Sequence, residues 1–298
     1  MTKPLMIALF AMLFLSACSE KLSPSEKLMS NPTEVKISSL EDLESVFNGL
    51  NYTPEDWENG LKEVPRLTFE SVSPEWQQAS ENMPVENKKS IFLRLILPLV
   101  LVSNENILRE REVVKNAKLT TPELISIALK YRVIDDNATV LTNKHKQQLL
   151  TRVNTIPPSL ALAQAAEESA WGTSRFALEG NAFFGQWDFS GNGIKPKQQR
   201  TELGNYGIAR FDSPLASVEG YMLNINSNSA YKPLRELRAK QVAAKKTFSG
   251  TLLAGTLIKY SERGEEYIKG LRGLISYNKL GLIDDTFLSD NNLVHLLY

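Results

Sequence analysis

The hydrophobic and polar positions of this chain recur mostly with helical spacing. Ser39, a residue type that caps helix N-termini, is followed by Leu40, Leu43 and Phe47 at intervals of three and four residues. The same periodicity predicts helices over 121–131, 141–153, 215–227, 230–240, 251–260 and 265–279. Strand patterns are few, and the glycine-rich segment 183–211 favours loops with one or two short hairpin strands. The chain is therefore predicted to be mainly α (α+β), with a small β-hairpin insert.

One apolar run, residues 91–102, is long enough to raise the question of a membrane span. Arg94 and Pro98 interrupt this run, and charged residues flank it on both sides. We therefore expect a buried helix, kinked at Pro98, that continues through Arg111.

The segment 157–172 joins a closely packed helix to two adjacent carboxylates. Two prolines and a serine mark the helix start, and the alanines that follow favour close packing against neighbouring elements. Glu168 lies one turn after Gln164 and three residues before Trp171, which predicts that the three share one face. A carboxyl group desolvated beside an indole has a raised pKa and can act as a general acid. The residues alone leave the choice between Glu167 and Glu168 open, and a Glu pair at a helix end also fits a solvated cap or an ion pair.

Composition and charge narrow the classes of function. The 298 residues include 34 basic and 34 acidic side chains, and no run of Lys or Arg supplies the basic surface of a nucleic-acid binder. His145 and His295 are isolated, and no His, Cys or carboxylate cluster has the spacing of metal ligands. No glycine-rich phosphate loop follows a predicted strand, and no G-x-S-x-G element is present. We therefore expect neither a metal nor a cofactor, and no nucleic-acid partner.

The first residues have the layout of a secretory signal: Lys3, about a dozen apolar residues, and then small residues. The only cysteine, Cys18, follows a Leu-Ser-Ala sequence that resembles a bacterial lipobox, in which the Cys is lipidated and becomes the mature N-terminus. This resemblance implies a signal peptide over 1–17, and a lipidated Cys followed by a polar tether over 18–38. Ser19 after the Cys resembles the sorting pattern for the outer membrane, so a lipid anchor facing the periplasm is expected.

The stretch 157–187 reads PPSLALAQAAEESAWGTSRFALEGNAFFGQW and resembles the signature of Bax-like glucosaminidases. These are relatives of the flagellar peptidoglycan-cutting glucosaminidases, which share a lysozyme-like fold. Further matches follow in order at 210–222, 224–231 and 260–271. The resemblance covers residues 141–276 well and reaches back more faintly to about Phe69. It implies a lysozyme-like glucosaminidase domain over 118–298 and an N-terminal helical region over 39–117.

The resemblance also assigns catalytic residues. The family's catalytic Glu falls on Glu168 rather than on its neighbour, and Tyr267 matches a Tyr that the family keeps near the acid. Glycoside hydrolysis usually needs a second carboxylate, which related enzymes place on a β-hairpin where Glu202 is expected. Asp188 and Glu219 are the alternatives. Without a nearby second carboxylate, the acetamido group of the substrate could act as the nucleophile.

Aromatic and amide side chains around the acid suit a sugar substrate. The expected substrate-binding residues are Trp171, Asn181, Phe184, Gln186, Trp187 and Tyr231. Among them, Trp171 and Phe184 are expected to be mainly structural, and Trp187 is expected to be the main sugar contact. The family usually has Gly at the position of Ala170 and often Asn-Leu at 182–183, departures that leave the acid in place.

Together these features predict a peptidoglycan hydrolase, an endo-β-N-acetylglucosaminidase that cleaves β-1,4 bonds after N-acetylglucosamine with Glu168 as its acid. Three alternatives stay open. A lytic transglycosylase of the same fold needs a single Glu, a non-catalytic wall-binding lipoprotein needs none, and a glucosaminidase could act on another acetamido-sugar polymer such as a chitin-like chain. The expected partners are glycan strands and, through the lipid anchor, a membrane.

Overall fold

The structure is a computed structural model that describes residues 32–73, 75–199 and 204–298. In these residues the chain is mainly α, with small sheets at its edges, and the predicted fold class is confirmed. The architecture is consistent with a lysozyme-like helical domain that carries a small β insert.

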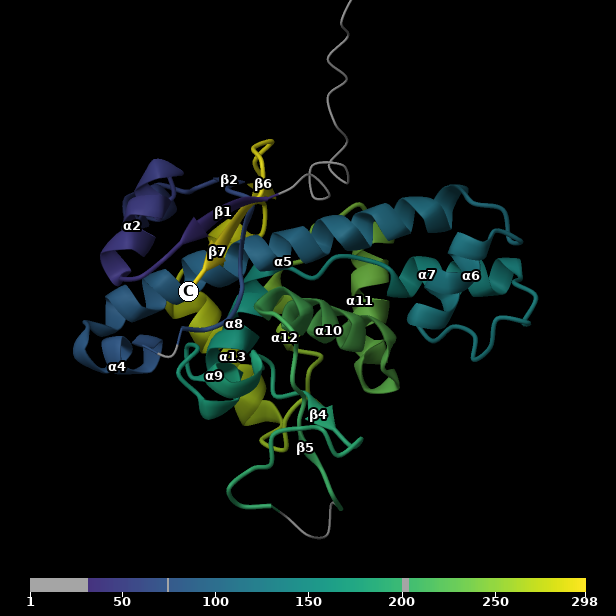
Figure 1. The fold of residues 1–298 in the computed structure, drawn as a ribbon. Coiled ribbons are helices and arrows are strands. Elements are labelled where there is room, and N and C mark those ends of the chain that lie inside the picture. The colour runs from purple at the N-terminus through teal and green to yellow at the C-terminus, as the bar shows by residue number, and fades with distance from the viewer. Residues whose placement is uncertain (1–31, 74, 200–203) are drawn as a thin grey trace, which may run out of the picture.

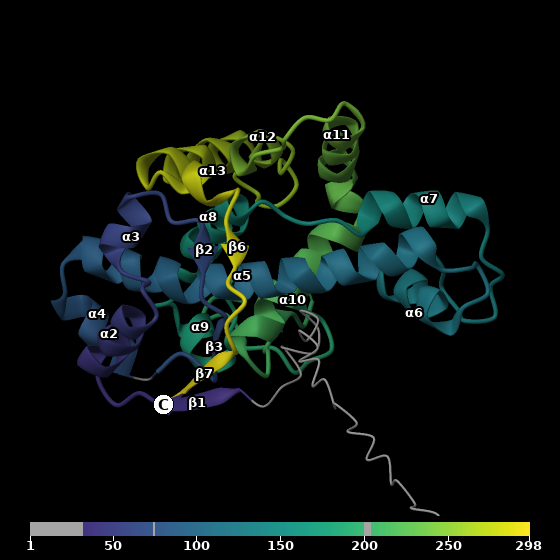
Figure 2. The same ribbon diagram turned by 90° about the horizontal axis from the view of Figure 1, so that it is seen from above.

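A helix of 32 residues, α5 (Val85–Asn116), runs through the middle of the molecule (Figures 1 and 2). It contains Pro98 without ending there, and its apolar residues from Ile91 to Val102 are almost all buried. By length and composition it is the one helix among the described residues that could cross a membrane, yet 78% of its apolar window is buried inside the fold. The prediction of a buried core helix is therefore confirmed.

Helices from the second half of the chain enclose α5. α8 (Pro158–Ser169) and α10 (Pro214–Ser227) pack directly against it, and α12 (Gly250–Ala254) and α13 (Glu265–Tyr277) pack against α8. In Figure 2, α12 and α13 form an upper layer over α8. Because α8 has neighbours on both sides, it needs the small alanine side chains that its sequence provides.

Shorter helices cover the two ends of α5 (Figure 2). α2 (Leu40–Gly49), α3 (Pro54–Glu58) and α4 (Glu75–Asn82) lie near its N-terminal end, and α6 (Pro122–Lys130) and α7 (Asn143–Arg152) near its C-terminal end. The remaining helical segments are α9 (Arg175–Gly180), η2 (Ser229–Tyr231), α11 (Lys232–Ala243) and η3 (Leu280–Ile283). The helices predicted from periodicity are confirmed except for the one over 251–260.

That exception has a local cause. α12 ends at Ala254, and the chain then turns through Gly255 toward α13. Tyr260 in this connection is partly buried, and its hydroxyl donates to the carbonyl of Phe184 at 2.9 Å. A tertiary contact therefore replaces the helical continuation that the periodicity predicted.

A small parallel sheet joins the first described residues to the C-terminal ones, and the sequence did not predict it. β7 (Val294–Leu297) lies between β1 (Thr33–Lys36) and β3 (Leu67–Phe69). A second parallel pair joins β2 (Glu63–Val64) to β6 (Phe287–Leu288). The predicted tether over 18–38 is therefore wrong at its C-terminal end, where β1 is part of the sheet.

The predicted hairpin insert is confirmed. β4 (Trp187–Asp188) pairs antiparallel with β5 (Gly207–Ile208), and Ile194 bridges to Ile208. A Cβ atom on Gly193 would lie 2.9 Å from the Ile208 carbonyl oxygen, so only glycine allows this close approach.

Buried residues before and after position 117 form one hydrophobic cluster. Phe92 and Ile96 on α5, for example, belong to the same cluster as Leu160 on α8 and Leu271 on α13. The domain boundary predicted at residue 117 stays a prediction, but the N-terminal region shares its core with the rest of the fold.

Candidate active site

Helix α8 holds the predicted acid on a rigid support. Its first turn is capped by Asp284, whose two carboxylate oxygens accept from the Ser159 amide and hydroxyl, each at 2.8 Å. Its alanines are buried on all sides. Glu168 lies in the last turn of this helix. Because the helix cannot shift in a close-packed core, the position of the carboxyl group is fixed.

The helix ends one residue after the acid, at Ser169. The two residues that follow, Ala170 and Trp171, are both left-handed, with φ of 50° and 59°. The Ser169 hydroxyl accepts from the Gly172 amide at 2.9 Å and closes the turn. The prediction that Trp171 shares a helical face with Glu168 is therefore wrong.

Trp171 instead packs on the core helix. Its ring meets Phe92 edge-on with centroids 5.6 Å apart. Gly172 lies against the Phe92 ring as well, because a Cβ atom there would be 3.2 Å from Phe92 Cδ2. The contacts of Trp171 fit the structural role expected for it.

The protonation of Glu168 depends on its burial and on three neighbouring side chains. Burial raises the pKa of Glu168, and the neighbouring charge of Glu167 raises it further. A hydrogen bond from Tyr267 and the charge of Arg263 act in the opposite direction. Arg263 forms an ion pair with Glu167. Gly185 lies close to the acid: a Cβ atom on it would be 3.1 Å from Glu168 Oε2, so glycine leaves space next to that oxygen.

The hydrogen-bond network fixes the direction of the Tyr267 hydroxyl. Tyr221 donates to Gln164 Oε1 at 2.7 Å, which leaves the Gln164 amide to donate to the Tyr267 oxygen at 3.1 Å. The Tyr267 proton is then free to be donated to a neighbouring acceptor such as Glu168. Burial raises the pKa of both tyrosines well above the usual value, so both stay neutral donors at physiological pH.

Two further tyrosines complete this cluster, which we call the phenol cluster: Tyr221, Tyr231, Tyr260 and Tyr267. The Tyr260 ring stacks on Tyr267 with centroids 5.5 Å apart and an interplanar angle of 4°, and it lies 5.7 Å from Tyr231. Sequence reasoning named Tyr267 and Tyr231 but not the other two. The only signal for Tyr260 was its place in the family-like stretch 260–271.

Trp187 is placed as an exposed sugar contact would be. It lies on β4 with 45% of its surface exposed. Its ring stacks on Tyr206 with centroids 5.0 Å apart, so the hairpin holds it in place. A fixed, exposed indole offers a flat apolar face without a large loss of side-chain entropy on binding.

The other predicted sugar contacts are more enclosed. Phe184 is buried and stacked on Tyr221 at 4.0 Å, which fits the structural role expected for it. Asn181 is buried at the C-terminus of α9, and its amide donates to the Phe211 carbonyl at 3.2 Å. Tyr231 is buried in the phenol cluster, and the side-chain oxygen of Gln186 is buried without a hydrogen-bond partner. Their roles in binding stay predictions.

The second carboxylate is not settled by the described residues. Glu202 lies outside them. Asp188 accepts from the Ser190 amide and hydroxyl and from the Gly193 amide, so it holds the turn after β4. Glu219 lies two positions before Tyr221 on α10 and accepts from Asn106 of α5 at 2.9 Å. Two positions correspond to about 200° around a helix, which turns Glu219 away from the Tyr221 side.

The two histidines have local partners. His295 lies in β7 and hydrogen-bonds Thr68 at 2.8 Å, and His145 takes part in the N-terminal cap of α7. In residues 32–73, 75–199 and 204–298, no three His, Cys, Asp or Glu residues are grouped closely enough to hold a metal ion.

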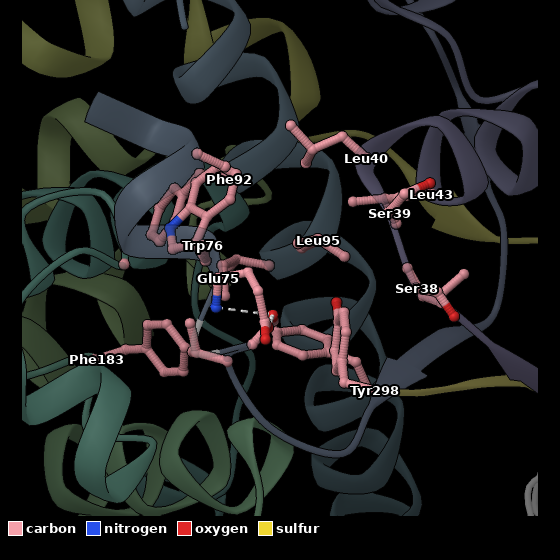
Figure 3. Close-up of a pocket in the computed structure, with 17 residues that line it drawn as sticks. Ser38, Ser39, Leu40, Leu43, Glu75, Trp76, Phe92, Leu95, Phe183 and Tyr298 are labelled. Atoms are coloured by element: carbon pink, nitrogen blue, oxygen red, sulfur yellow. Dashed lines mark hydrogen bonds between the residues drawn. The ribbon is translucent and has the colours of Figure 1, made fainter. Parts of the chain in front are cut away.

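A separate apolar cavity of about 250 Å³ lies between α2, α4 and α5. Figure 3 shows Trp76, Phe92 and Phe183 on one side of it and Leu40 and Leu43 on the other. Neither the predicted acid nor any member of the phenol cluster is among its lining residues. The cavity is therefore distinct from the candidate active site.

Comparison with known proteins gives a family match over the part of the chain that contains the candidate active site. Residues 144–280 match the glucosaminidase family, described as mannosyl-glycoprotein endo-beta-N-acetylglucosaminidase. The chain is also 30% identical over 190 residues to Protein bax of Escherichia coli (strain K12). That alignment covers 60% of this chain and spans 66% of the length of the relative. No solved structure matches the chain.

Proposed function

Because this chain is a Bax-like protein that carries a glucosaminidase domain, we propose that it hydrolyses β-1,4 bonds after N-acetylglucosamine in peptidoglycan, with Glu168 as the general acid. Membership of the family supports the coarser statement, a glycosidase that acts on a glycan. The bond, the polymer and the endo mode of cleavage belong to the proposal.

One observation carries the proposal: the environment of the Glu168 carboxyl at the end of a close-packed helix, which raises its pKa. Burial raises its pKa, so that a proton is available at a pH where an exposed Glu has lost it. That proton is transferred to the oxygen of the scissile glycosidic bond. The Tyr267 hydroxyl then stabilises the carboxylate that forms, because its own proton is not used in the bond from Gln164.

A second group, separate from the acid, starts the attack on the sugar. We place Glu202 in this role, as a base that activates water or as a nucleophile, on the segment between β4 and β5. Its distance from Glu168 decides which of the two roles it has. The acetamido group of the substrate is the alternative nucleophile. Trp187 stacks on a pyranose ring, and the remaining predicted contacts read acetamido and hydroxyl groups.

The proposed cellular location of the protein rests on the sequence of its N-terminal residues, which lie outside those described. We propose that Cys18 carries the lipid anchor after removal of residues 1–17, and that the protein faces the periplasm from the outer membrane. Peptidoglycan is then within reach of a short tether. Metabolic labelling with a radioactive fatty acid tests this point, since Cys18→Ala removes the label if the assignment is right.

The test of the chemistry compares three proteins that start at Ser19: wild type, Glu168→Gln and Glu167→Gln. Each is incubated with purified peptidoglycan, and the products are identified by mass spectrometry. We expect reducing N-acetylglucosamine ends from the wild type and from Glu167→Gln, and at least about a hundredfold loss for Glu168→Gln. The neighbouring variant is a matched control, because it removes the same group one position earlier.

Two other outcomes would replace the proposal. Anhydro-muramic ends from the wild type would identify a lytic transglycosylase of the same fold. If none of the three proteins forms products but all three still sediment with peptidoglycan, the protein is a non-catalytic wall-binding protein.

A further inference from the structure

A second concave surface lies beside the N-terminal end of α5. It is a groove of about 680 Å³ between α3, the start of α5 and the C-terminal end of α13. We call it the α3–α13 groove. Its lining includes Trp57, Glu86, Lys89, Arg94, Tyr277 and Asn278. Most of it comes from residues before 144, outside the part of the chain that matches the glucosaminidase family.

An aromatic side chain stands open on this surface. Tyr277 is 72% exposed, although the exposure of an aromatic ring to water is unfavourable. The ammonium group of Lys89 lies 4.8 Å from the centre of its ring, in a cation–π contact. The groove also contains Trp57, a second aromatic residue that is partly exposed. Fixed aromatic faces of this kind are typical of surfaces that bind ligands.

The charges of the groove largely neutralise each other. Arg94 forms a bidentate ion pair with Glu44, at 2.7 and 3.0 Å, and Lys89 pairs with Glu86 at 3.2 Å. The charged lining residues comprise three acids and three bases: Glu44, Glu58, Glu86, Lys89, Arg94 and Lys279. A balanced polar surface with open rings suits a neutral ligand with both hydroxyl groups and apolar faces. Sugars have this chemistry, and nucleic acids and other polyanions do not.

The groove is connected to the active site in two ways. Lys89 lies over Trp171 as well as Tyr277, and Trp171 directly follows the helix that carries the acid. Tyr267 and Tyr277 both belong to α13, so this helix leads from the acid's partner to the groove. Ten residues of helix separate the two tyrosines by about 15 Å. A single sugar at Glu168 does not reach this far, but a polymer does.

We propose that the α3–α13 groove binds a further sugar unit of the glycan chain whose bond is cleaved at Glu168. This inference rests on the proposed function and extends it, since the N-terminal region then selects long chains over short ones. The groove contacts no reacting atom, so it is a binding subsite.

The test measures binding without turnover. Glu168→Gln protein is titrated calorimetrically with β-1,4-linked N-acetylglucosamine oligomers of two and of six units. In this background, Tyr277→Ala weakens hexamer binding by about five- to tenfold, the usual effect of losing one aromatic contact, and leaves dimer binding unchanged. Tyr277→Phe keeps the ring and restores the affinity. Phe287→Ala is the matched control, because it removes an aromatic ring that is 57% exposed on β6.

The outcomes separate this inference from the proposed chemistry. Equal hexamer affinity for Tyr277→Ala and Phe287→Ala, or no oligomer binding at all, overturns the inference even if wild type cleaves peptidoglycan. A specific loss with Tyr277→Ala in a protein whose wild type forms no products keeps the subsite and removes the hydrolase. Circular dichroism of each variant verifies that the fold is intact.

Discussion

At the scale of single residues, the protonation of Glu168 is set by opposing neighbours. Burial at the end of α8 raises its pKa, and a helix C-terminus disfavours a negative charge in the same sense. Glu167 adds a second negative charge, and Arg263 compensates for part of it. The acid therefore titrates in a field that single substitutions can change in either direction.

Substitution of Glu167 and of Arg263 should shift the pKa of Glu168, and with it the pH dependence of activity, in opposite directions. A general acid is active when protonated, so activity is lost as the pH rises through the pKa of Glu168. Glu167→Gln removes a charge that raises this pKa, and the alkaline limb of the pH profile of kcat/KM moves to lower pH. Arg263→Gln removes a charge that lowers it, and the limb moves to higher pH. Product release from peptidoglycan across pH 5 to 9 measures both.

Salt and a distant ion pair serve as controls for this prediction. Arg263 and Glu167 are partly exposed, so both displacements become smaller in high salt. Arg175→Gln breaks an exposed pair with Glu179 and leaves the limb in place. If Glu167→Gln and Arg263→Gln moved the alkaline limb in the same direction, this result would contradict the assignment of Glu168 as the titrating acid.

At the scale of elements, α8 is fixed from its opposite end. Asp284 accepts from the amide and hydroxyl of Ser159 and also from the Gly250 amide at 3.1 Å. One carboxylate therefore caps the acid-bearing helix and α12 together. The N-cap residue of α8 is Pro157, which provides no side-chain cap. The long-range cap takes the place of the local side-chain cap that Pro157 cannot supply.

Loss of this double cap should be costly. We expect Asp284→Ala to lower the free energy of unfolding by about 2–4 kcal/mol, since each lost helix cap contributes about 1–2 kcal/mol. Asp285→Ala removes the same group from the exposed adjacent position and should change stability by less than about 0.5 kcal/mol. Urea unfolding measures both. Similar losses for the two variants would show that the caps contribute nothing specific.

The elements also show where sequence reasoning reaches its limit. The long helices were predictable, because an apolar residue every three or four positions is a local signal that α5 and α13 carry throughout. The family-like motif located Glu168 and Tyr267. The end of α8 was not predictable, because Ala170 and Trp171 adopt left-handed conformations that their residue types do not favour. The indole of Trp171 therefore packs against Phe92 instead of sharing a helical face with Glu168.

At the scale of the whole molecule, the chain closes on itself. β7, almost the last segment, lies between β1 and β3, which are among the first described ones. Strands of three or four residues have too little alternation to be recognised, and their partners lie at the other end of the sequence. Only tertiary packing specifies this sheet. As a consequence, the N-terminal region that lines the α3–α13 groove is attached to the C-terminus as well as to α5.

This closure predicts that the N-terminal region and the catalytic region unfold together. Leu296 of β7 is fully buried, and Leu296→Ala should lower the free energy of unfolding by about 2–4 kcal/mol, as other core truncations do. Leu297→Ala makes the same change at the next, partly exposed position and should cost about 1 kcal/mol or less. Urea titrations followed by both tryptophan fluorescence and circular dichroism should give one coincident transition for each protein. If Leu296→Ala instead produces two transitions, with hydrogen exchange increased in β1 and β3 but not in α8, the N-terminal region is an independent unit. Its groove would then be an attached module, not a part of the enzyme's own binding surface.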